Sequence, residues 1–319
     1  MTAAAANVLA MRLMHAHEVG AAGMIELDED LLIHAENADV LPKLPDASFD
    51  LIYIDPPFNT GHVQRKRTVS TEHDEAGQRV GFGGRRYRTR LLTDLSFDDD
   101  RREYLDFIVP RLEHARRLLA VHGTLYLHLD YREAHYCKLA LDEIFGRDCF
   151  LNEIVWAYDY GGKPKRRWPA KHDTILVYVR TAGRHHFDSE AVEREPYMAP
   201  GLVTPEKARR GKMPVDTWWH TIVPTNGKEK TGYPTQKPEG VVRRIVAASS
   251  RERGWCLDFF AGSGTLGAVC AALDRRFVLV DHSPSAIAIA ARRLEPEAQQ
   301  RLGSEASPSL TSGAQTAAG

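Results

Sequence analysis

Cysteine is scarce in this sequence of 319 residues, and its four copies lie far apart. No two of them have the Cys-x-x-Cys spacing of zinc sites, and their spacing indicates no disulfide framework. The histidines show no metal-ligand spacing either, so we expect no metal site. These absences favour the reducing environment of the cytoplasm, where we expect the protein to be located. The cysteines are Cys137, Cys149, Cys256 and Cys270.

Long hydrophobic runs are also absent. Nothing in the chain resembles a transmembrane helix, so we expect no membrane partner. Residues 1–7 are rich in alanine but lack the basic region, apolar core and cleavage site of a secretory signal. The formal net charge is only -1, from 42 Lys and Arg against 43 Asp and Glu. If the chain binds nucleic acid, its positive surface must therefore be local.

Hydrophobic residues make up 43% of the chain, which is enough for a sizeable core in one large domain with insertions. Predicted strands and helices alternate, which is typical of an α/β fold with a mainly parallel, doubly wound sheet. We expect strands at 31–34, 49–54, 124–129, 153–158, 174–179, 256–259 and 277–280, the fourth and fifth forming a hairpin. We expect helices at 40–44, 104–119, 133–145, 241–249, 265–273 and 286–294.

These patterns divide the chain into five parts. The first lacks a clear strand pattern and is interpreted as a loosely attached arm or short helix. The third is an insertion, because periodicity fades there and Pro, Gly, Lys and Arg accumulate. The last has too few apolar residues to be ordered. The parts are 1–30, 31–180 with a mobile basic loop at 60–102, 181–230, 231–298 and a disordered tail at 299–319.

A carboxylate stands at the end of one predicted strand. Asp55-Pro56-Pro57-Phe58 follows the apolar run 51–54 and leads into Asn59. The prolines fix φ and supply carbonyl acceptors without competing N–H donors. A planar amine could stack on Phe58 while its hydrogens bond to Asp55 and to a proline carbonyl. Asp and Pro are also common turn residues, so the tetrapeptide alone leaves both interpretations open.

A glycine-rich loop joins another predicted strand to a helix. Asp258-Phe259-Phe260-Ala261-Gly262-Ser263-Gly264-Thr265 contains two glycines, and Gly267 completes the pattern G-x-G-x-x-G. Asp281 follows the next strand, where it could accept hydrogen bonds from ribose hydroxyls. NAD and S-adenosylmethionine both fit these features, and tight packing alone would also explain the glycines. The loop therefore predicts a nucleoside ligand without choosing between these two.

Three motifs, taken in order, resemble the beta group of DNA amino-methyltransferases. They are Asp55-Pro56-Pro57-Phe58-Asn59, then Tyr233-Pro234-Thr235-Gln236-Lys237-Pro238-Glu239, then the glycine loop. The resemblance covers about residues 31–294. It implies a permuted methyltransferase fold with 181–230 as target-recognition segment, S-adenosylmethionine as cofactor and double-stranded DNA as partner. It also allows a homodimer and a cognate restriction endonuclease, for which the residues give no signal.

The resemblance assigns roles to individual residues. Asp39 would contact the cofactor adenine, although Ala38 stands where the family often has glycine. Asp281 would lie near the ribose, and Lys237, in the same motif as Thr235, near the methionine carboxylate. Other residues would line the ribose and methionine part, namely Asp258, Phe260, Ala261, Gly262 and Gly264. The catalytic residues would be Asp55, Pro56, Pro57 and Phe58, which receive a base flipped out of the duplex.

Besides the basic loop at 60–102, two basic clusters are candidates for phosphate contacts. One combines basic side chains with Trp168, and the other lies in the insertion before Trp218-Trp219. A solvated surface and aromatic anchoring to the core are the alternative explanations. The clusters contain Lys163, Lys165, Arg166 and Arg167, and Arg209 and Arg210.

The resemblance favours N6 of adenine as the methyl acceptor, because an aspartate at the start of the motif, as at Asp55, is more typical of adenine enzymes. Cytosine N4 is the alternative. A C5-cytosine mechanism needs a cysteine nucleophile, and no Pro-Cys dipeptide occurs. A nicotinamide-dependent oxidoreductase would use the glycine loop but leave Asp55 without a role. A regulator without catalytic activity would keep only the fold and the basic segments.

Overall fold

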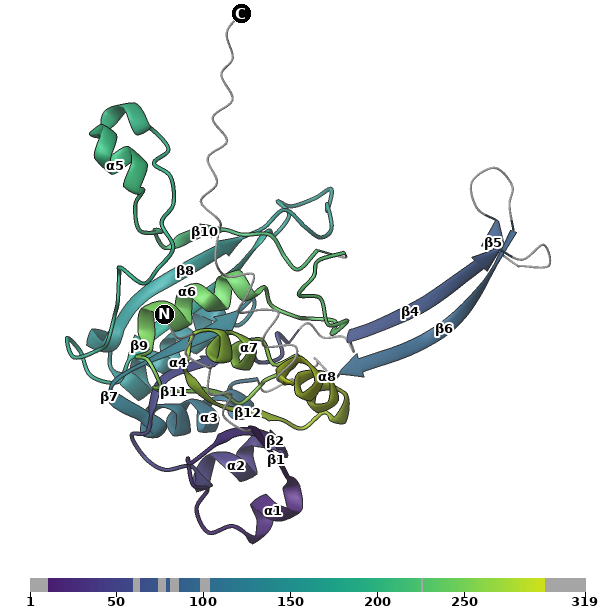
Figure 1. Cartoon of the computed structure of the whole chain (residues 1–319), viewed down its shortest axis with the longest axis horizontal. Helices are drawn as coiled ribbons and strands as arrows, with labels where there is room; N and C mark the ends of the chain where they lie inside the picture. The colour runs from purple at the N-terminus through teal and green to yellow at the C-terminus, as the bar shows by residue number, and fades with distance from the viewer. Residues whose placement is uncertain are drawn as a thin grey trace, which may run out of the picture.

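The computed structural model describes residues 11–59, 64–73, 79–80, 86–97, 104–224 and 226–295. Within them, nine strands form one sheet in the order β1-β2-β12-β11-β3-β7-β9-β8-β10 (Figure 1). All neighbouring strands are parallel except that β9 is antiparallel to β7 and β8. The expected mainly parallel sheet and its hairpin are confirmed. The strands are β1 (Met11–His15), β2 (Asp30–His34), β3 (Phe49–Ile54), β7 (Leu119–Leu129), β8 (Phe150–Ala157), β9 (His172–Val179), β10 (Thr217–Trp219), β11 (Trp255–Asp258) and β12 (Arg276–Asp281).

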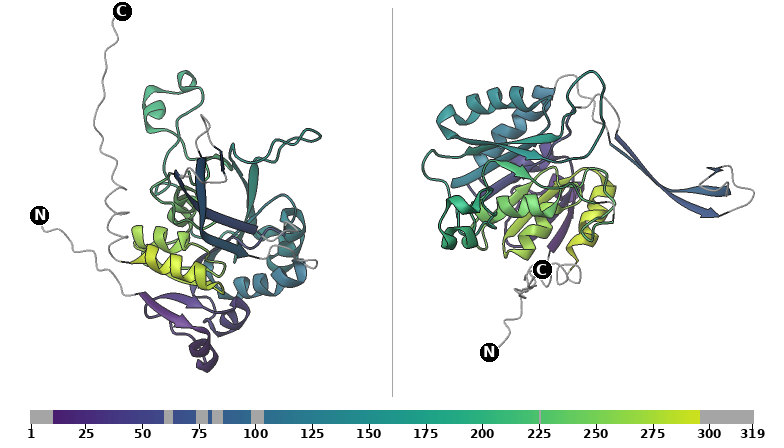
Figure 2. Two further views of the ribbon diagram at one scale, coloured as in Figure 1. Left: turned by 90° about the vertical axis from the view of Figure 1, so that its right-hand side faces the viewer. Right: turned by 90° about the horizontal axis from the view of Figure 1, so that it is seen from above.

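Helices cover both faces of this sheet (Figure 2). The helices of the described residues are α1 (Ala16–Ala21), α2 (Asn37–Val40), α3 (Tyr104–Leu118), α4 (Ala134–Phe145), α5 (Pro205–Arg210), α6 (Glu239–Ser249), α7 (Thr265–Ala272) and α8 (Pro284–Leu294), with short 3₁₀ turns at Leu41–Lys43, Arg147–Cys149 and Pro200–Leu202. Most of the expected helices are confirmed to within a few residues. The exception is the one at 40–44, where α2 begins earlier and only a 3₁₀ turn follows it.

The N-terminal residues differ from the expectation. Residues 11–15 are not a loose arm but form β1, which pairs in parallel with β2, and only α1 matches the short helix. Met14 is 4% exposed, whereas the adjacent Leu13 is 40% exposed. Because Met14 is the single buried residue of this edge strand, the sequence carries little strand periodicity there.

The basic segment 60–102 is not a loop in its described parts. β4 (Gln64–His73) and β6 (Arg86–Phe97) pair as a long antiparallel ribbon, and β5 (Arg79–Val80) pairs with β6. The ribbon projects from the body of the molecule (Figures 1 and 2). Its threonine and valine residues favour strands, but the basic residues among them pointed to a loop. Its mobility stays a prediction, and the predicted tail 299–319 lies outside the described residues.

The insertion 181–230 belongs partly to the core. Its strand β10 pairs with β8, and Trp218 is 8% exposed, while Trp219 is 73% exposed. Helix α5 of the same insertion stands away from the body (Figure 1).

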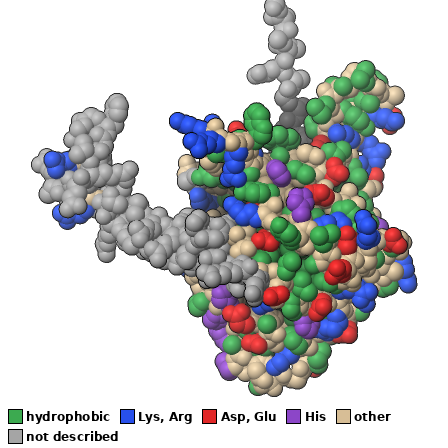
Figure 3. Space-filling view, turned by 180° about the vertical axis from the view of Figure 1, so that it is seen from behind, with side chains coloured by type: hydrophobic (Ala, Val, Ile, Leu, Met, Phe, Trp, Pro, Cys, Tyr) green, Lys and Arg blue, Asp and Glu red, His purple; other side chains and the backbone are tan. Residues whose placement is uncertain are grey.

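Charged side chains of both signs are spread over the face in Figure 3, with Lys and Arg gathered beside the ribbon. Among the described residues, no helix combines the length and apolarity needed to span a bilayer.

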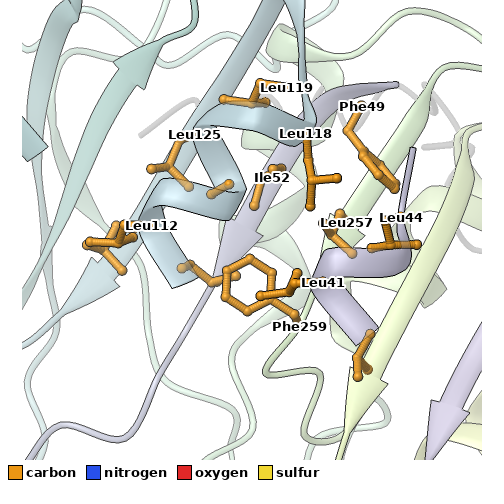
Figure 4. Close-up of a cluster of buried hydrophobic side chains, with 14 of the residues drawn as sticks. Leu41, Leu44, Phe49, Ile52, Leu112, Leu118, Leu119, Leu125, Leu257 and Phe259 are labelled. Carbon is orange, nitrogen blue, oxygen red and sulfur yellow. The ribbon is translucent and has the colours of Figure 1, made fainter. Parts of the chain in front are cut away.

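Two apolar layers hold the sheet between its helices. Since successive strand residues point to opposite faces, Ile52 and Ile54 pack in the layer with α3 and α4. Leu51 and Tyr53 pack in the layer with α6, α7 and α8. Figure 4 shows part of the first layer, around Ile52 and Leu257. Strands buried on both faces need apolar runs, as residues 51–54 of β3 show.

The position of β1 in the sheet can be tested by truncating its buried side chain. We expect Met14→Ala to lower the free energy of unfolding by about 2 kcal/mol or more, because it leaves a cavity at the sheet edge. The control Leu13→Ala removes an exposed side chain, and its effect should stay within about 0.5 kcal/mol. Urea unfolding followed by circular dichroism measures both, and equal effects would show that β1 is not packed against the core.

Candidate functional site

The carboxyl ends of the central parallel strands carry acidic residues at one edge of the sheet. Asp55 follows β3, while Asp258 and Asp281 end the neighbouring strands β11 and β12. Crevices outside the carboxyl ends of such strands are the usual ligand sites of doubly wound sheets. The fold therefore brings Asp55 together with two carboxyl groups that lie more than two hundred residues later in the sequence.

Asp55 has one occupied and one free oxygen. Lys237 Nζ donates to Asp55 Oδ2 at 2.5 Å. The Asp55 side chain is 16% exposed and the Lys237 side chain is 11% exposed. Asp55 Oδ1 is buried and has no hydrogen-bond partner among the residues that the structure describes. Lys237 Nζ also lies 4.6 Å from the centre of the Phe58 ring, a cation–π distance. An acceptor and an aromatic face are thus adjacent, as the Asp-Pro-Pro-Phe motif predicted.

A network of hydrogen-bonded polar side chains lies next to the Phe58 ring. The Tyr53 hydroxyl lies 2.9 Å from His128 Nδ1, and His128 Nε2 lies 3.2 Å from Asp173 Oδ2. Tyr158 donates to the other Asp173 oxygen at 2.9 Å. The His128 ring, which is fully buried, lies 5.9 Å from that of Phe58. The network joins β3, β7, β9 and the end of β8, so it fixes the strand ends around Phe58 relative to one another.

The sequence interpretation missed this network, because it considered the histidines only as possible metal ligands. Burial favours the neutral form of Asp173, yet hydrogen bonding and charge from His128, together with the Lys237 charge, hold the pKa of Asp173 below its usual range. The network therefore contains a buried carboxylate that stays ionised. The one sequence signal was a polar residue inside an otherwise apolar strand, 124–129.

A cavity of about 610 Å³ opens beside Phe58. Tyr158 and Asp173 of the polar network line it, and so do Lys163 and Arg167 from the loop between β8 and β9. This loop carries the first predicted DNA-binding cluster, whose four basic side chains are all exposed. The second cluster is not brought to the cavity. Arg209 and Arg210 lie on the separate helix α5, where Arg210 pairs with Glu190 at 2.9 Å.

The glycine loop has the backbone that its sequence requires. Gly262 and Gly264 have φ values of +50° and +73°, a region that side chains disfavour. A Cβ on Gly262 would lie 3.1 Å from the Tyr233 ring, so the second motif packs directly on the third. The Gly262 N–H donates to Asp281 Oδ2 at 2.8 Å. Gly267 instead allows α7 to pack on Leu279, where a Cβ would lie 2.7 Å from the side chain.

The segment that contains Thr235 and Lys237 is fixed along its backbone. Gln236 accepts a hydrogen bond from Thr231 N at 2.8 Å and donates to the Glu229 carbonyl at 2.7 Å. The hydroxyl of Thr265, the first residue of α7, donates to the Lys237 carbonyl at 3.3 Å. Thr235 itself is exposed. The Lys237 side chain therefore extends from a fixed backbone toward Asp55.

At the far end of the site, the sequence interpretation named Asp39 and missed Asn37. Asp39 is exposed on α2, which follows β2 beside β12. Asn37 is buried and donates to the Phe259 carbonyl at 2.8 Å. Arg111 donates to the Asn37 side-chain oxygen at 2.6 Å, and its guanidinium lies 4.0 Å from the centre of the Phe107 ring. These contacts brace the loop that contains Phe260 and Ala261.

The three carboxylates make this edge strongly electronegative. Burial raises the pKa of Asp258 well above its usual range, and repulsion from Asp55 and Asp281 adds to this effect. Burial and the same three carboxylates also raise the pKa of Tyr233. A cationic ligand would relieve this repulsion, whereas an anionic one would increase it.

Comparison with known proteins identifies the family. A DNA methylase family model, N6_N4_Mtase, matches residues 49–292. The chain belongs to this family. It is 30% identical over 266 residues to the type II methyltransferase M.HpaI of Haemophilus parainfluenzae. This alignment covers 83% of this chain and 74% of the relative. It is 28% identical over 272 residues to the DNA adenine methyltransferase YhdJ of Escherichia coli K12, covering 83% and 82% of the two chains.

A solved structure supports the same fold. The PvuII DNA methyltransferase, described as cytosine-N4-specific, aligns with 85% of this DNA methylase and 89% of its own chain, at 14% identity and a TM-score of 0.57. The predicted family and the methyltransferase type of fold are therefore confirmed. Membership of this S-adenosylmethionine-dependent family also confirms the expected cofactor. S-adenosylmethionine therefore replaces NAD as the expected ligand of the glycine loop.

The residues of the site fit this cofactor. S-adenosylmethionine carries a sulfonium and an ammonium group against a single carboxylate, so its positive charge would favour the ionised forms of Asp258 and Asp281, whose pKa values burial raises. A nicotinamide dinucleotide would instead bring a pyrophosphate to three carboxylates. The bound cofactor would be held by Asp258, Asp281 and the backbone of Gly262 and Gly264. Cationic Lys237 would pair with the cofactor carboxylate.

The raised pKa of Asp258 predicts how stability changes with pH. Because folded Asp258 keeps its proton to higher pH than the unfolded chain does, stability should fall as pH rises from the usual pKa of 3.8 through the raised value. Asp258→Asn removes this titration. We expect the cofactor-free variant to lose less stability than the natural protein between pH 5 and pH 8 in urea unfolding.

The matched control for this experiment is the same replacement at exposed Asp148. That variant should follow the natural protein across the pH range. If Asp258→Asn does so as well, the carboxyl of Asp258 is not held in its neutral form by burial.

Proposed function

We propose that this protein is a site-specific DNA methyltransferase that methylates N6 of an adenine flipped out of double-stranded DNA. The observation that carries the proposal is the free, buried oxygen of Asp55 beside the Phe58 ring, next to a cavity of about 610 Å³. The 28% identity to a DNA adenine methyltransferase supports adenine. The family also covers cytosine N4, which is the alternative acceptor.

Asp55 and Pro56 would act on the amine itself. The lone pair of an exocyclic amine is delocalised into its ring, which makes the nitrogen a weak nucleophile. Asp55 Oδ1 accepts one N–H and the Pro56 carbonyl accepts the other. These bonds strengthen as the nitrogen becomes pyramidal and positive, so they stabilise the transition state more than the ground state. Bound S-adenosylmethionine supplies an electrophilic methyl group.

Phe58 and the cavity would receive the extruded base. Taking a base out of the duplex costs a few kcal/mol, and stacking on an aromatic ring returns about 1–3 kcal/mol. The network of Tyr53, His128, Asp173 and Tyr158 keeps the Phe58 ring in place for this contact. Pro57 stiffens the backbone between the acceptor and the ring.

The loop between β8 and β9 would hold the DNA backbone. Lys163 and Arg167 reach the cavity, and Lys165 and Arg166 are exposed beside them, so phosphates flanking an extruded base would meet positive charge. In the insertion, Arg209 and exposed Trp219 are candidates for target recognition. A homodimer, a cognate endonuclease and the division into domains stay predictions.

Product analysis tests the proposed reaction. Unmodified genomic DNA is incubated with the protein and S-adenosylmethionine, digested to nucleosides and analysed by mass spectrometry. We expect N6-methyladenine. If N4-methylcytosine alone appears, the acceptor is cytosine, and if no methylated base forms, the protein is not a DNA methyltransferase. Mapping the modified bases then gives the recognition sequence.

The role of Asp55 is tested in the same assay. Asp55→Ala removes an acceptor that acts in the transition state, so the methylation rate should fall about 10²–10³-fold. Calorimetry should show that the variant still binds S-adenosylmethionine, because the glycine loop is intact. An unchanged rate would contradict the proposed mechanism.

The basic loop is tested by the salt dependence of DNA binding. Each phosphate contact contributes about 0.9 to the slope of log K against log salt, so Arg167→Gln should lower the slope by about 1 and weaken binding. Fluorescence anisotropy with a labelled duplex at several salt concentrations measures this slope.

The control is Arg147→Gln. This arginine follows the C-terminal end of α4, and its side chain is 87% exposed. Its slope should match that of the natural protein. Arg209→Gln tests the insertion in the same way. A slope unchanged by Arg167→Gln would show that this loop does not contact phosphate.

A further inference from the structure

Lys237 contacts the two side chains that an incoming amine needs, Asp55 and Phe58. Its ammonium group donates to Asp55 Oδ2 at 2.5 Å and lies 4.6 Å from the centre of the Phe58 ring. A target base would also donate an N–H to Asp55 and stack on Phe58. Both side chains of the ion pair are less than one-fifth exposed, so solvent screens this contact only weakly.

We propose that Lys237 is a positioning residue that occupies the amine site when no base is present and transfers its ammonium group to the cofactor carboxylate when a base enters. This role rests on the proposed function, because it concerns the same amine site. It differs from a simple cofactor contact, since Lys237 has two alternative partners and the choice between them controls access to Asp55.

The local structure allows this exchange by side-chain rotation alone. Thr265 and the contacts of Gln236 fix the backbone on either side of Lys237. The lysine side chain is a flexible four-carbon stem with a compact charge, so it can move while the backbone stays in place. Tyr233, four residues earlier, packs on Gly262, so the same segment contacts the glycine loop.

Charge balance couples this movement to the cofactor. Moving the ammonium group away leaves Asp55 without its cationic partner, and a buried unpaired charge is costly. The cofactor carboxylate offers the ammonium group a new partner, while the amine of the base gives Asp55 a new donor. Base entry and cofactor binding should therefore favour each other, and typical couplings between sites are about 5–150-fold.

A double-mutant cycle on the full chain tests this coupling without turnover. Calorimetry gives the Kd of S-adenosylhomocysteine, which has the same carboxylate, for the natural protein, Asp55→Asn, Lys237→Met and the double variant. If Asp55 and the ligand compete for Lys237, the effect of Asp55→Asn should differ by at least about 5-fold between the two residue-237 backgrounds. Effects that multiply independently would overturn the proposal.

The matched control uses another ion-paired lysine. Lys138 lies on α4, where its Nζ is 2.7 Å from Asp142 and faces the Phe150 and Tyr178 rings rather than the site. Lys138→Met should therefore combine with Asp55→Asn without interaction. Lys237→Arg keeps the charge and serves if Lys237→Met fails to fold. It should hold Asp55 more firmly than lysine and weaken ligand binding, and an unchanged Kd would count against the proposal.

Base extrusion gives a second readout. A duplex with the mapped target and 2-aminopurine next to it becomes fluorescent when the target base leaves the stack. With the natural protein the rise should require S-adenosylhomocysteine, and with Lys237→Met it should occur without this ligand. A continued requirement in Lys237→Met would overturn the proposal. If the chain binds no S-adenosylhomocysteine at all, the proposed function fails, whereas binding with independent effects refutes only the role of Lys237.

Discussion

The parallel pairing of β3, β11 and β12 is the constraint on which the site depends. It forces three carboxyl groups, those of Asp55, Asp258 and Asp281, to one edge of the sheet, where burial raises the pKa of Asp258 and of Asp281. The rest of the site compensates for this charge. Backbone N–H groups of the glycine loop bond to two of the carboxylates, and Lys237 bonds to the third.

Rigid and movable parts are clearly separated around this edge. The hydrogen bonds from Tyr53 through His128 to Asp173 are buried between strand ends, and Tyr158 extends this chain to the wall of the cavity. Lys237 and the loop between β8 and β9 lie on the open side of the same residues. A fixed acceptor and ring therefore face a flexible lysine side chain, which suits the proposed need to hold an amine accurately and yet admit a base.

The sequence revealed those features whose evidence is local. The apolar run before Asp55 and the glycine loop each combine a strand with its functional residue, so their elements and order could be predicted. The network of His128, Asp173 and Tyr158 could not, because its members come from three strands and meet only through pairing. β1 carries a single buried side chain, and the ion pair of Asp55 with Lys237 joins residues 182 apart in the sequence.

The reversed direction of β9 has a consequence for how such an enzyme can change. In an all-parallel sheet, β8 and β9 would be joined by a long crossover, but here a hairpin turns at the functional edge and forms the rim of the cavity. Residues can be gained or lost in that turn without shifting the register of any strand. The reaction and the proposed phosphate contacts can therefore evolve separately, with the turn altered and the carboxylates left untouched.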